Sequence, residues 1–411
     1  MIVNVIVAEY NPFHNGHQFH IEEAAKQTHA DYTIVIMSGN FVQRGAPALM
    51  DKYTRARMAL LGGADLCLEL PAYYAVSSAE YFATGSVALA EKLGVATHLC
   101  FGSECGDITV LERIADILVD EPVTYKEQFQ RQLREGASYP TARMNALLQY
   151  DPSLMDYRDV LERPNNILGI EYIKALRKRG SSIQPHTIKR VGSDYHERHL
   201  GDDHPSAQAI RYALNAGQQL EQLHNLVPEK VYALMSSGYE ENSLLYSRDL
   251  SAAMQYKLIQ EKAKGYTQYL DVSRDLSDRI TNCLYDFTDY EGFCDILKSK
   301  NMTSTRISRC LLHILLDIRK ETMQHYVSLD YIPFIKMLGF RKESTPLLGA
   351  ITKQADIPLL SKLADAKTQL SADALDMLED EIRISDIYQS ALSQKNGQPM
   401  RNEYREPLVI V

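Results

Sequence analysis

The chain has 411 residues, of which 45% are hydrophobic and 24% charged, and this composition excludes wholesale disorder or a collagen-like repeat. Its length is sufficient for two or three domains with a sizeable core. The formal net charge is −9, so no overall basic field attracts nucleic acid, and an RNA partner would need a local basic patch.

Cysteine spacing and the lack of targeting segments indicate the compartment. None of the six cysteines forms a CxxC pair, which argues against a zinc site and is typical of reduced thiols. The N-terminus lacks the basic flank and cleavage site of a signal peptide, and no apolar run reaches the roughly 20 residues of a membrane helix. We therefore predict a cytoplasmic protein with no membrane span and no protein-bound metal.

Buried apolar runs alternate with helical patterns in the first hundred residues. The predicted elements are strand 3–9, helix 17–28, strand 32–37, helix 51–61 with Asp51 as N-cap, strand 64–70, helix 77–93 and strand 97–101. This alternation predicts an α/β fold with a parallel sheet covered on both faces. Such sheets bind ligands at the carboxyl ends of their strands, so the loops there are where chemistry is expected.

The pattern becomes helical further along the chain. Residues 108–180 are predicted to be helical, 184–191 to form a last strand, and 206–216 a helix capped by Ser206. Beyond about residue 220 the chain is predicted to be helical throughout. A boundary near 220 then gives an α/β domain over residues 1–220 and a mostly α-helical C-terminal domain over residues 221–411.

The run EYNPFHNGH at residues 9–17 lies between a buried strand and a helix. A helix N-terminus presents unpaired N–H groups and a partial positive charge, which suits phosphate. Gly16 removes a side chain where backbone must approach an anion closely. His14 and His17 flank it, and imidazoles there can stabilise the extra charge of a phosphoryl-transfer transition state. The alternative is a pair of surface histidines beside a helix cap, but HxGH at a strand-to-helix turn favours the functional interpretation.

The run HNGH at residues 14–17 resembles the HIGH-type signature of the nucleotidyltransferase superfamily. Together with SGNFVQRG at 38–45, it is similar to the bacterial tRNA(Met) cytidine acetate ligase family. The similarity continues through FGSE at 101–104, PNNILGIEYIKAL at 164–176, KRVGSDYH at 189–196, SAQAIR at 206–211 and TSTRISR at 303–309. It covers nearly the whole chain and implies that residues 1–220 form a Rossmann-like nucleotidyltransferase domain.

The resemblance implies a two-step reaction. Acetate attacks the α-phosphate of ATP, which gives acetyl-adenylate and pyrophosphate. The exocyclic amine of the wobble cytidine in elongator tRNA(Met) then takes the acetyl group and releases AMP, so that the product is N4-acetylcytidine. Mg²⁺ is expected on the triphosphate, held mostly by substrate and water. No base for the cytidine amine can be identified, and Asp194 and His196 are only candidates.

The resemblance also implies which residues act on ATP. His14 and His17 are the expected catalytic residues. Asn165 and Asn166 open a helix, so capping is the alternative for both, and Gln208 stands where the family usually has a hydroxyl residue. Arg190 offers a fork for phosphate, and Arg211 is expected to hold the leaving pyrophosphate. The full expected ATP-binding set is Val7, Ala8, Glu9, Tyr10, Asn11, Pro12, Phe13, His14, Asn15, Gly16, His17, Gly102, Asn165, Asn166, Arg190, Val191 and Arg211.

Basic residues in the second half of the chain are candidates for a tRNA platform. Each phosphate neutralised would add a salt-dependent increment to binding, although a charged surface helix explains any single cluster. The set expected to bind tRNA is Lys298, Lys300, Arg306 and Arg309. Lys52 and Arg55, one helical turn apart, are instead predicted to lie on a solvated helix face.

Two other functions compete with this interpretation. A small-metabolite adenylyltransferase would leave AMP on its product and would need only the first domain, so the helical half would be unexplained. A non-catalytic RNA-binding protein on a nucleotide-binding scaffold would not need the two histidines.

Overall fold

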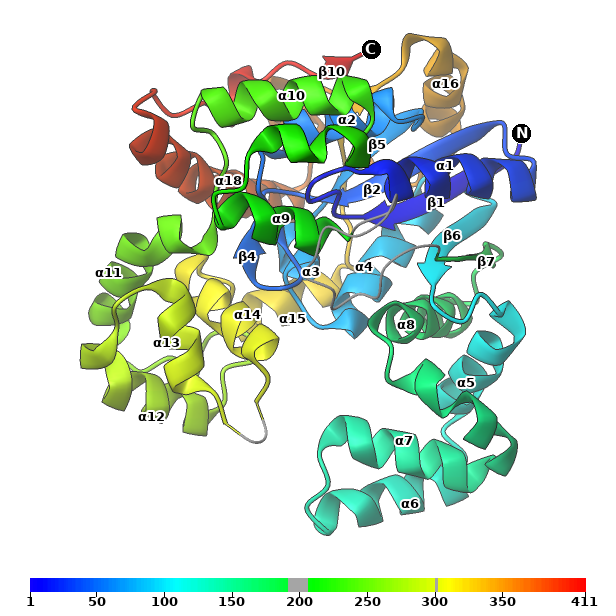
Figure 1. Cartoon of the computed structure of the whole chain (residues 1–411). Helices are drawn as coiled ribbons and strands as arrows, with labels where there is room; N and C mark the ends of the chain where they lie inside the picture. Colours follow the sequence, from blue (N-terminus) through cyan, green and yellow to red (C-terminus); the bar gives the residue numbers. More distant parts are fainter. Residues whose placement is uncertain (191–205, 300–301) are drawn as a thin grey trace.

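The computed structural model describes residues 1–190, 206–299 and 302–411. Its centre is a mostly parallel sheet with strand order β10-β8-β5-β2-β1-β6-β7, and β9 pairs with β8 (Figure 1). The strands are β1 Val3–Ala8, β2 Tyr32–Ser38, β5 Leu66–Leu70, β6 His98–Ser103, β7 Gln184–Lys189, β8 Ile335–Phe340, β9 Leu359–Leu360 and β10 Val409–Ile410. A separate hairpin consists of β3 Phe41–Val42 and β4 Ala46–Pro47.

Helices cover the sheet and form two lobes that project from it (Figure 1). Those in the first half are α1 Asn15–Thr28, α2 Lys52–Leu61, α3 Ala72–Ala75, α4 Ala79–Lys92, α5 Ile108–Asp120, α6 Val123–Arg134, α7 Tyr139–Tyr150, α8 Pro164–Arg179 and α9 Ala207–Asn215. Those in the second half are α10 Glu229–Glu240, α11 Ser251–Glu261, α12 Arg274–Cys283, α13 Tyr290–Leu297, α14 Ser304–Leu315, α15 Lys320–Ser328, α16 Thr345–Gln354, α17 Ala366–Gln369 and α18 Ala372–Asn396. One lobe contains α6 and α7, and the other contains α11 to α14.

The strand order reverses at β1. From β1 the chain proceeds to β2 and β5 on one side, whereas β6 and β7 lie on the other side of β1. The parallel register aligns Val5 with Ile34 of β2 and with Leu99 of β6, and all three side chains are buried. At such a switch point the loops that leave neighbouring strands diverge and open a crevice. The topology therefore places a crevice beside the loop that follows β1.

The predicted α/β fold with a mostly helical C-terminal region is confirmed. All strands and helices expected in the first hundred residues are present, and Asp51 and Ser206 cap their helices as predicted. The first helix begins two residues earlier than expected, at Asn15, because His14 is its N-cap. The expected last strand of this region ends at Lys189, and Val191 lies outside the described residues.

The prediction of helix throughout after residue 220 was wrong at β8, β9 and β10. Strand β8 pairs antiparallel with β5, and β9 and β10 each pair parallel with β8. Ile335 and Leu338 are fully buried in this sheet, so the C-terminal part supplies the edge of the sheet begun by the N-terminal part. The division of the chain at residue 220 stays a prediction.

Arg55 is fully buried, which contradicts the predicted solvated helix face. Its guanidinium donates to four backbone carbonyls: to Met50 from Nε at 2.9 Å, to Glu9 and Ser38 from Nη1 at 2.7 and 3.1 Å, and to Gly39 from Nη2. A buried guanidinium has to satisfy its N–H donors, and these carbonyls do so. The side chain thereby joins the ends of β1 and β2 to the start of α2.

Lys52 is also buried, and it belongs to a cluster of alternating charges. Its Nζ lies 2.8 Å from Glu69 and 2.5 Å from Glu403, and Lys336 Nζ lies 2.8 Å from Glu69 and 2.6 Å from Glu403. Burial by itself would raise the pKa of the Glu403 carboxyl, but the two lysines outweigh it and lower that pKa. Ion pairs make this burial tolerable and connect strands β5 and β8 to the C-terminal segment.

Replacing Arg55 with alanine should lower the free energy of unfolding by about 3 kcal/mol, because several buried carbonyls lose their donor. Chemical denaturation measures the change. Arg57→Ala is a matched control on the exposed face of the same helix and should change stability by no more than about 0.5 kcal/mol. Equal effects of the two substitutions would contradict the proposed structural role of Arg55.

Candidate active site

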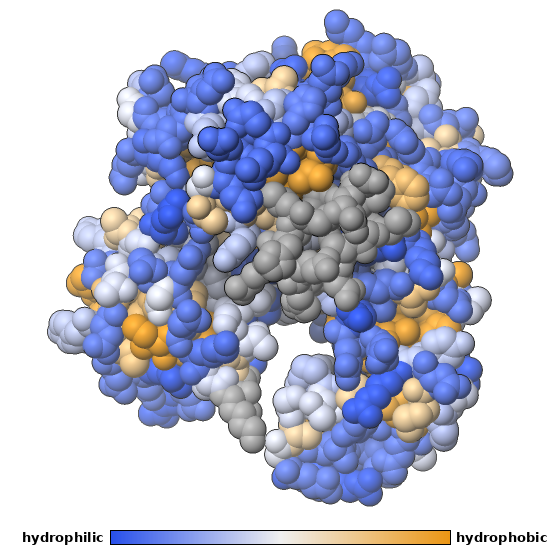
Figure 2. Space-filling view, in the orientation of Figure 1, coloured by the Kyte–Doolittle hydropathy of each residue, from blue (hydrophilic) through white to orange (hydrophobic). Residues whose placement is uncertain are grey.

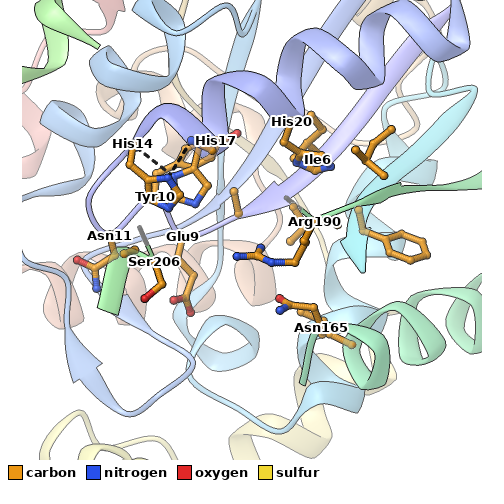
Figure 3. Close-up of a pocket in the computed structure, with 18 of the residues that line it drawn as sticks. Ile6, Glu9, Tyr10, Asn11, His14, His17, His20, Asn165, Arg190 and Ser206 are labelled. Carbon is orange, nitrogen blue, oxygen red and sulfur yellow. Dashed lines mark hydrogen bonds between the residues drawn. The ribbon is translucent and has the colours of Figure 1, made fainter. Parts of the chain in front are cut away.

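A pocket of about 230 Å³ opens at the carboxyl ends of β1, β6 and β7. It lies at the crevice that the strand order requires, between the turn into α1, the start of α8 and the start of α9 (Figure 3). Loop residues Gln43 and Arg44, which follow β2, also line it. The pocket therefore collects residues that are far apart in the chain, such as Asn11 and Arg211, which are 200 positions apart.

His14 and His17 hold the turn into α1 through a reciprocal cap. The Nδ1 of His14 accepts from the backbone N–H of Gly16 at 3.1 Å, and the Nδ1 of His17 accepts from the backbone N–H of His14 at 3.3 Å. When Nδ1 accepts a hydrogen bond in a neutral imidazole, the proton is on Nε2. Both rings line the pocket, so the cap fixes two Nε2–H donors at a helix N-terminus.

The two imidazoles stack, with ring centroids 3.7 Å apart and planes 28° apart. Tyr10 packs edge-on against the His17 ring at 4.8 Å. Burial, then the neighbouring His14, Arg190 and His20, lower the pKa of His17 well below its ordinary value, so this ring is neutral at pH 7. The pair thus offers two hydrogen-bond donors to the pocket, held in place by packing and by the backbone.

Gly16 is required by the position of the His14 ring. A Cβ at residue 16 would lie 2.9 Å from His14 Cε1 and 3.1 Å from its Nδ1. Contacts this short to carbon are repulsive, so any side chain would push the ring out of the cap. The glycine in HNGH therefore leaves space for the first histidine, in addition to the close approach to an anion inferred from the sequence.

The charged residues that line the described part of the pocket are mostly cations. The lining includes one carboxylate, that of Glu9, and four cationic side chains: Arg44, Lys189, Arg190 and Arg211. Cations with the helix N-terminus create a positive potential that suits a triphosphate. Arg211 also donates through Nη1 to the carbonyl of Asn11, which links α9 to the turn after β1.

Asn165 and Asn166 have different surroundings. Asn165 lines the pocket, whereas Asn166 is buried and its Oδ1 accepts the backbone N–H groups of Glu104 and Cys105 at 2.9 and 3.1 Å. The Glu104 carboxylate in turn accepts the backbone N–H groups of both asparagines and so caps α8. Of the two, Asn165 lines the pocket, whereas Asn166 fixes the loop that directly follows β6, the strand that contains Gly102.

Most of the residues expected to bind ATP are brought together here. Those that line the pocket are Val7, Ala8, Glu9, Tyr10, Asn11, His14, Gly16, His17, Gly102, Asn165, Arg190 and Arg211. Pro12, Phe13, Asn15 and Asn166 do not line it: Phe13 is fully buried, and Asn15 donates to the carbonyl of Asn225. Val191, and the two candidate bases Asp194 and His196, lie outside the described residues.

Some lining residues were not found from the sequence. They are Ile6, Phe19, His20, Phe82, Leu168, Tyr172 and Ile188. Of these, only His20 had a signal in the sequence: it follows His17 by three residues and therefore lies on the same helix face. Its Nε2 is buried with no hydrogen-bond partner in the described structure, and burial lowers its pKa to about 4. The others are apolar, and only the tertiary fold brings them to the pocket.

The residues expected to bind tRNA differ in their exposure to solvent. Lys298 and Arg306 are exposed beside the N-terminus of α14, whereas Lys300 lies outside the described residues. Arg309 is largely buried, which lowers the pKa of its guanidinium, and its backbone packs against Gly45. A basic pair at the end of α8 is engaged in ion pairs, Arg177 with Glu112 and Asp116, and Arg179 with Glu91 and Asp330.

Within residues 1–190, 206–299 and 302–411, no group of three or more His, Cys, Asp or Glu side chains has the arrangement of a metal site. The helices of the same residues include none that is long and apolar enough to cross a membrane.

A strand-to-helix turn that aims two imidazole donors into a cationic pocket is the arrangement of a nucleotidyl-transfer enzyme. Comparison with known families agrees, since the model described as HIGH Nucleotidyl Transferase matches residues 1–403. The protein is thus a HIGH-type nucleotidyl transferase.

Similarity to individual proteins identifies the family within this class. The chain is 34% identical over 410 residues to the tRNA(Met) cytidine acetate ligase of Acetivibrio thermocellus, and 37% identical over 405 residues to that of a Thermoanaerobacter species, with 99% and 98% of each chain covered. The crystal structure of Thermotoga maritima TmcAL in its apo form I has a TM-score of 0.94 and 30% identity over 100% of both chains. Its form bound to α-thio ATP has a TM-score of 0.91. The chain belongs to the tRNA(Met) cytidine acetate ligase family, as its motifs predicted.

Replacing Gly16 with alanine should reduce nucleotidyl transfer about 100-fold, because the new Cβ displaces the His14 ring from its cap. Exchange of labelled pyrophosphate into ATP measures this rate. Gly349→Ala is a matched control in helix α16, where a Cβ meets nothing within 4 Å, and it should leave the rate unchanged. A normal rate in the Gly16 variant would mean that the ring position is unimportant.

Proposed function

We propose that the protein activates acetate with ATP and transfers the acetyl group to N4 of the wobble cytidine of tRNA(Met), with release of pyrophosphate and AMP. The single observation that supports this most strongly is the stacked His14–His17 pair, capped so that both rings present Nε2–H to the pocket. The reaction takes place in the cytoplasm, where ATP, acetate and tRNA are all available.

The first step needs positioning and charge stabilisation more than covalent work by the protein. Acetate is ionised at neutral pH and needs no base to act as a nucleophile. Its attack on the α-phosphate places additional negative charge on the phosphoryl oxygens, and the two histidines donate to them. Arg190 and Arg211 offset the charge of the triphosphate and of the departing pyrophosphate.

Magnesium enters this proposal as part of the substrate. The ion would be held chiefly by triphosphate oxygens and water. It would further neutralise the charge of the triphosphate.

The two helical lobes, one from each half of the chain, support a macromolecular acceptor over a small metabolite. The two helical lobes flank a hollow below the pocket, which Figure 2 shows as an opening through the lower part of the molecule. Lys298 and Arg306 lie on the α11–α14 lobe and face solvent. A small-metabolite adenylyltransferase would have no use for these lobes, whereas a tRNA arm needs a surface of this kind.

His14→Ala and His17→Ala should each reduce acetate-dependent pyrophosphate exchange by about 100- to 1000-fold, because each removes a donor to the transition state. Thermal melting should show that both variants fold. Gln18→Ala is the control, since this neighbour is absent from the pocket lining and bonds to Glu22 on the helix surface. Normal exchange in either histidine variant would exclude that residue from catalysis.

The combined substitution Lys298→Ala and Arg306→Ala should weaken tRNA binding about tenfold and reduce the slope of log affinity against log salt by roughly two. Filter binding at several salt concentrations measures both quantities. Arg309 is left out because its burial would confound folding with binding.

The matched control combines Arg57→Ala and Lys353→Ala, which remove two exposed cations from helices α2 and α16. Pyrophosphate exchange without tRNA should be normal in both double variants. If the two double variants have equal salt slopes, the α11–α14 lobe is not part of the tRNA-binding surface.

A further inference from the structure

Glu9 is the one carboxylate that lines the described part of the pocket. Its side chain leaves the end of β1 below the paired histidines, between Asn11 on one side and Arg190 and Asn165 on the other (Figure 3). One oxygen, Oε1, accepts the backbone N–H of Gln43 at 2.8 Å. The other oxygen, Oε2, has no protein partner among the described residues. The carboxylate is therefore held in one orientation and keeps one oxygen that can accept a hydrogen bond or a proton.

A carboxylate is the wrong charge for holding a triphosphate. At about 4 Å, two unit charges repel by roughly 4 kcal/mol near a protein surface, so Glu9 opposes the binding that the pocket's cations favour. The backbone carbonyl of Glu9 accepts a hydrogen bond from the Arg55 guanidinium and so has a structural role. That bond does not involve the side-chain carboxyl group of Glu9. The side chain therefore needs an explanation other than ATP affinity.

We infer that Glu9 accepts the proton of the cytidine amine in the acetyl-transfer step, an assignment that rests on the proposed function. The N4 nitrogen attacks the carbonyl carbon of acetyl-adenylate, and a C–N bond forms. The bond from that carbon to the phosphate oxygen breaks, and AMP leaves with the electron pair. The proton lost from N4 goes to the unengaged oxygen of Glu9, so charge and atoms balance.

The chemistry of the acceptor favours this pairing. The exocyclic amine of cytosine is a donor, and a glutamate carboxylate is its natural acceptor. An attacking amine becomes strongly acidic as its nitrogen acquires the acyl group, so an ordinary carboxylate is basic enough to take the proton. The Gln43 bond fixes Glu9 beside the histidines that hold the α-phosphate, where the acyl carbon of the adenylate must also lie.

The experiment separates the two half-reactions in the full-length enzyme. Pyrophosphate exchange with acetate, without tRNA, reports adenylate formation. Single-turnover transfer of labelled acetyl from preformed enzyme-bound adenylate to tRNA(Met) reports the second step. The variants are Glu9→Gln, whose amide oxygen can still accept from Gln43, and Glu9→Asp, which keeps a carboxylate.

Glu9→Gln should slow acetyl transfer about 100-fold more than it slows pyrophosphate exchange. Glu9→Asp should recover part of the transfer rate, which a role in loop anchoring alone does not predict. Glu22→Gln, an exposed carboxylate on helix α1, is the matched control and should behave as wild type in both assays.

Equal slowing of both steps by Glu9→Gln, reversed by added Mg²⁺, would assign Glu9 to the metal of the triphosphate and overturn the inference. Normal transfer in Glu9→Gln would overturn it as well. Absence of acetate-dependent exchange in the wild-type enzyme would instead refute the proposed function, so the two failures can be told apart.

Discussion

The buried guanidinium of Arg55 is the interaction on which the geometry of the pocket depends. It donates to carbonyls at the ends of β1 and β2 and just before α2, three segments that are separate along the chain. A cation removed from water must have its donors satisfied, and these carbonyls are the partners available to it. Because Glu9 carries one of those carbonyls, the position of the turn into α1 follows from the same bonds.

The histidine pair depends on that turn, and its rings both cap the helix and, in the proposed function, donate to the substrate. Each ring uses Nδ1 to cap the helix, and the same bond leaves Nε2 as the protonated nitrogen. Burial lowers the pKa of His17, so this ring is a neutral donor, and the arginine and lysine side chains that line the pocket supply positive charge. This arrangement suits phosphoryl chemistry, since donors fixed in a cap need little reorganisation as charge develops.

The C-terminal half is more than an addition to the catalytic domain. Strand β8 pairs with β5 at the sheet edge, and Lys336 of β8 shares the buried charges of Glu69 and Glu403 with Lys52. Asn40, from the loop after β2, donates to Ser385 of α18 at 3.0 Å, and Ser385 donates to Glu403 at 2.6 Å. The loop that carries Gln43 and Arg44 to the pocket is therefore held in part by residues more than 300 positions away.

The sequence by itself determined the class of fold and the position of the HNGH turn after the first strand. Alternating apolar strands and helices predicted the parallel sheet that the structure has, and HNGH after the first strand predicted an anion site at its carboxyl end, where the pocket opens. Local pattern also gave the caps at Asp51 and Ser206, because capping depends on neighbours in the chain.

Only the tertiary structure decided what depends on distant partners. A lysine and an arginine one turn apart, Lys52 and Arg55, are usually solvated, and their burial follows from carbonyls and carboxylates that the fold brings to them. The short strand β8 carries a buried lysine, Lys336, as its second residue, and that lysine is tolerated because Glu69 and Glu403 lie beside it. Sequence spacing reports periodicity along one element, whereas burial, pairing and pocket lining are set by which elements meet.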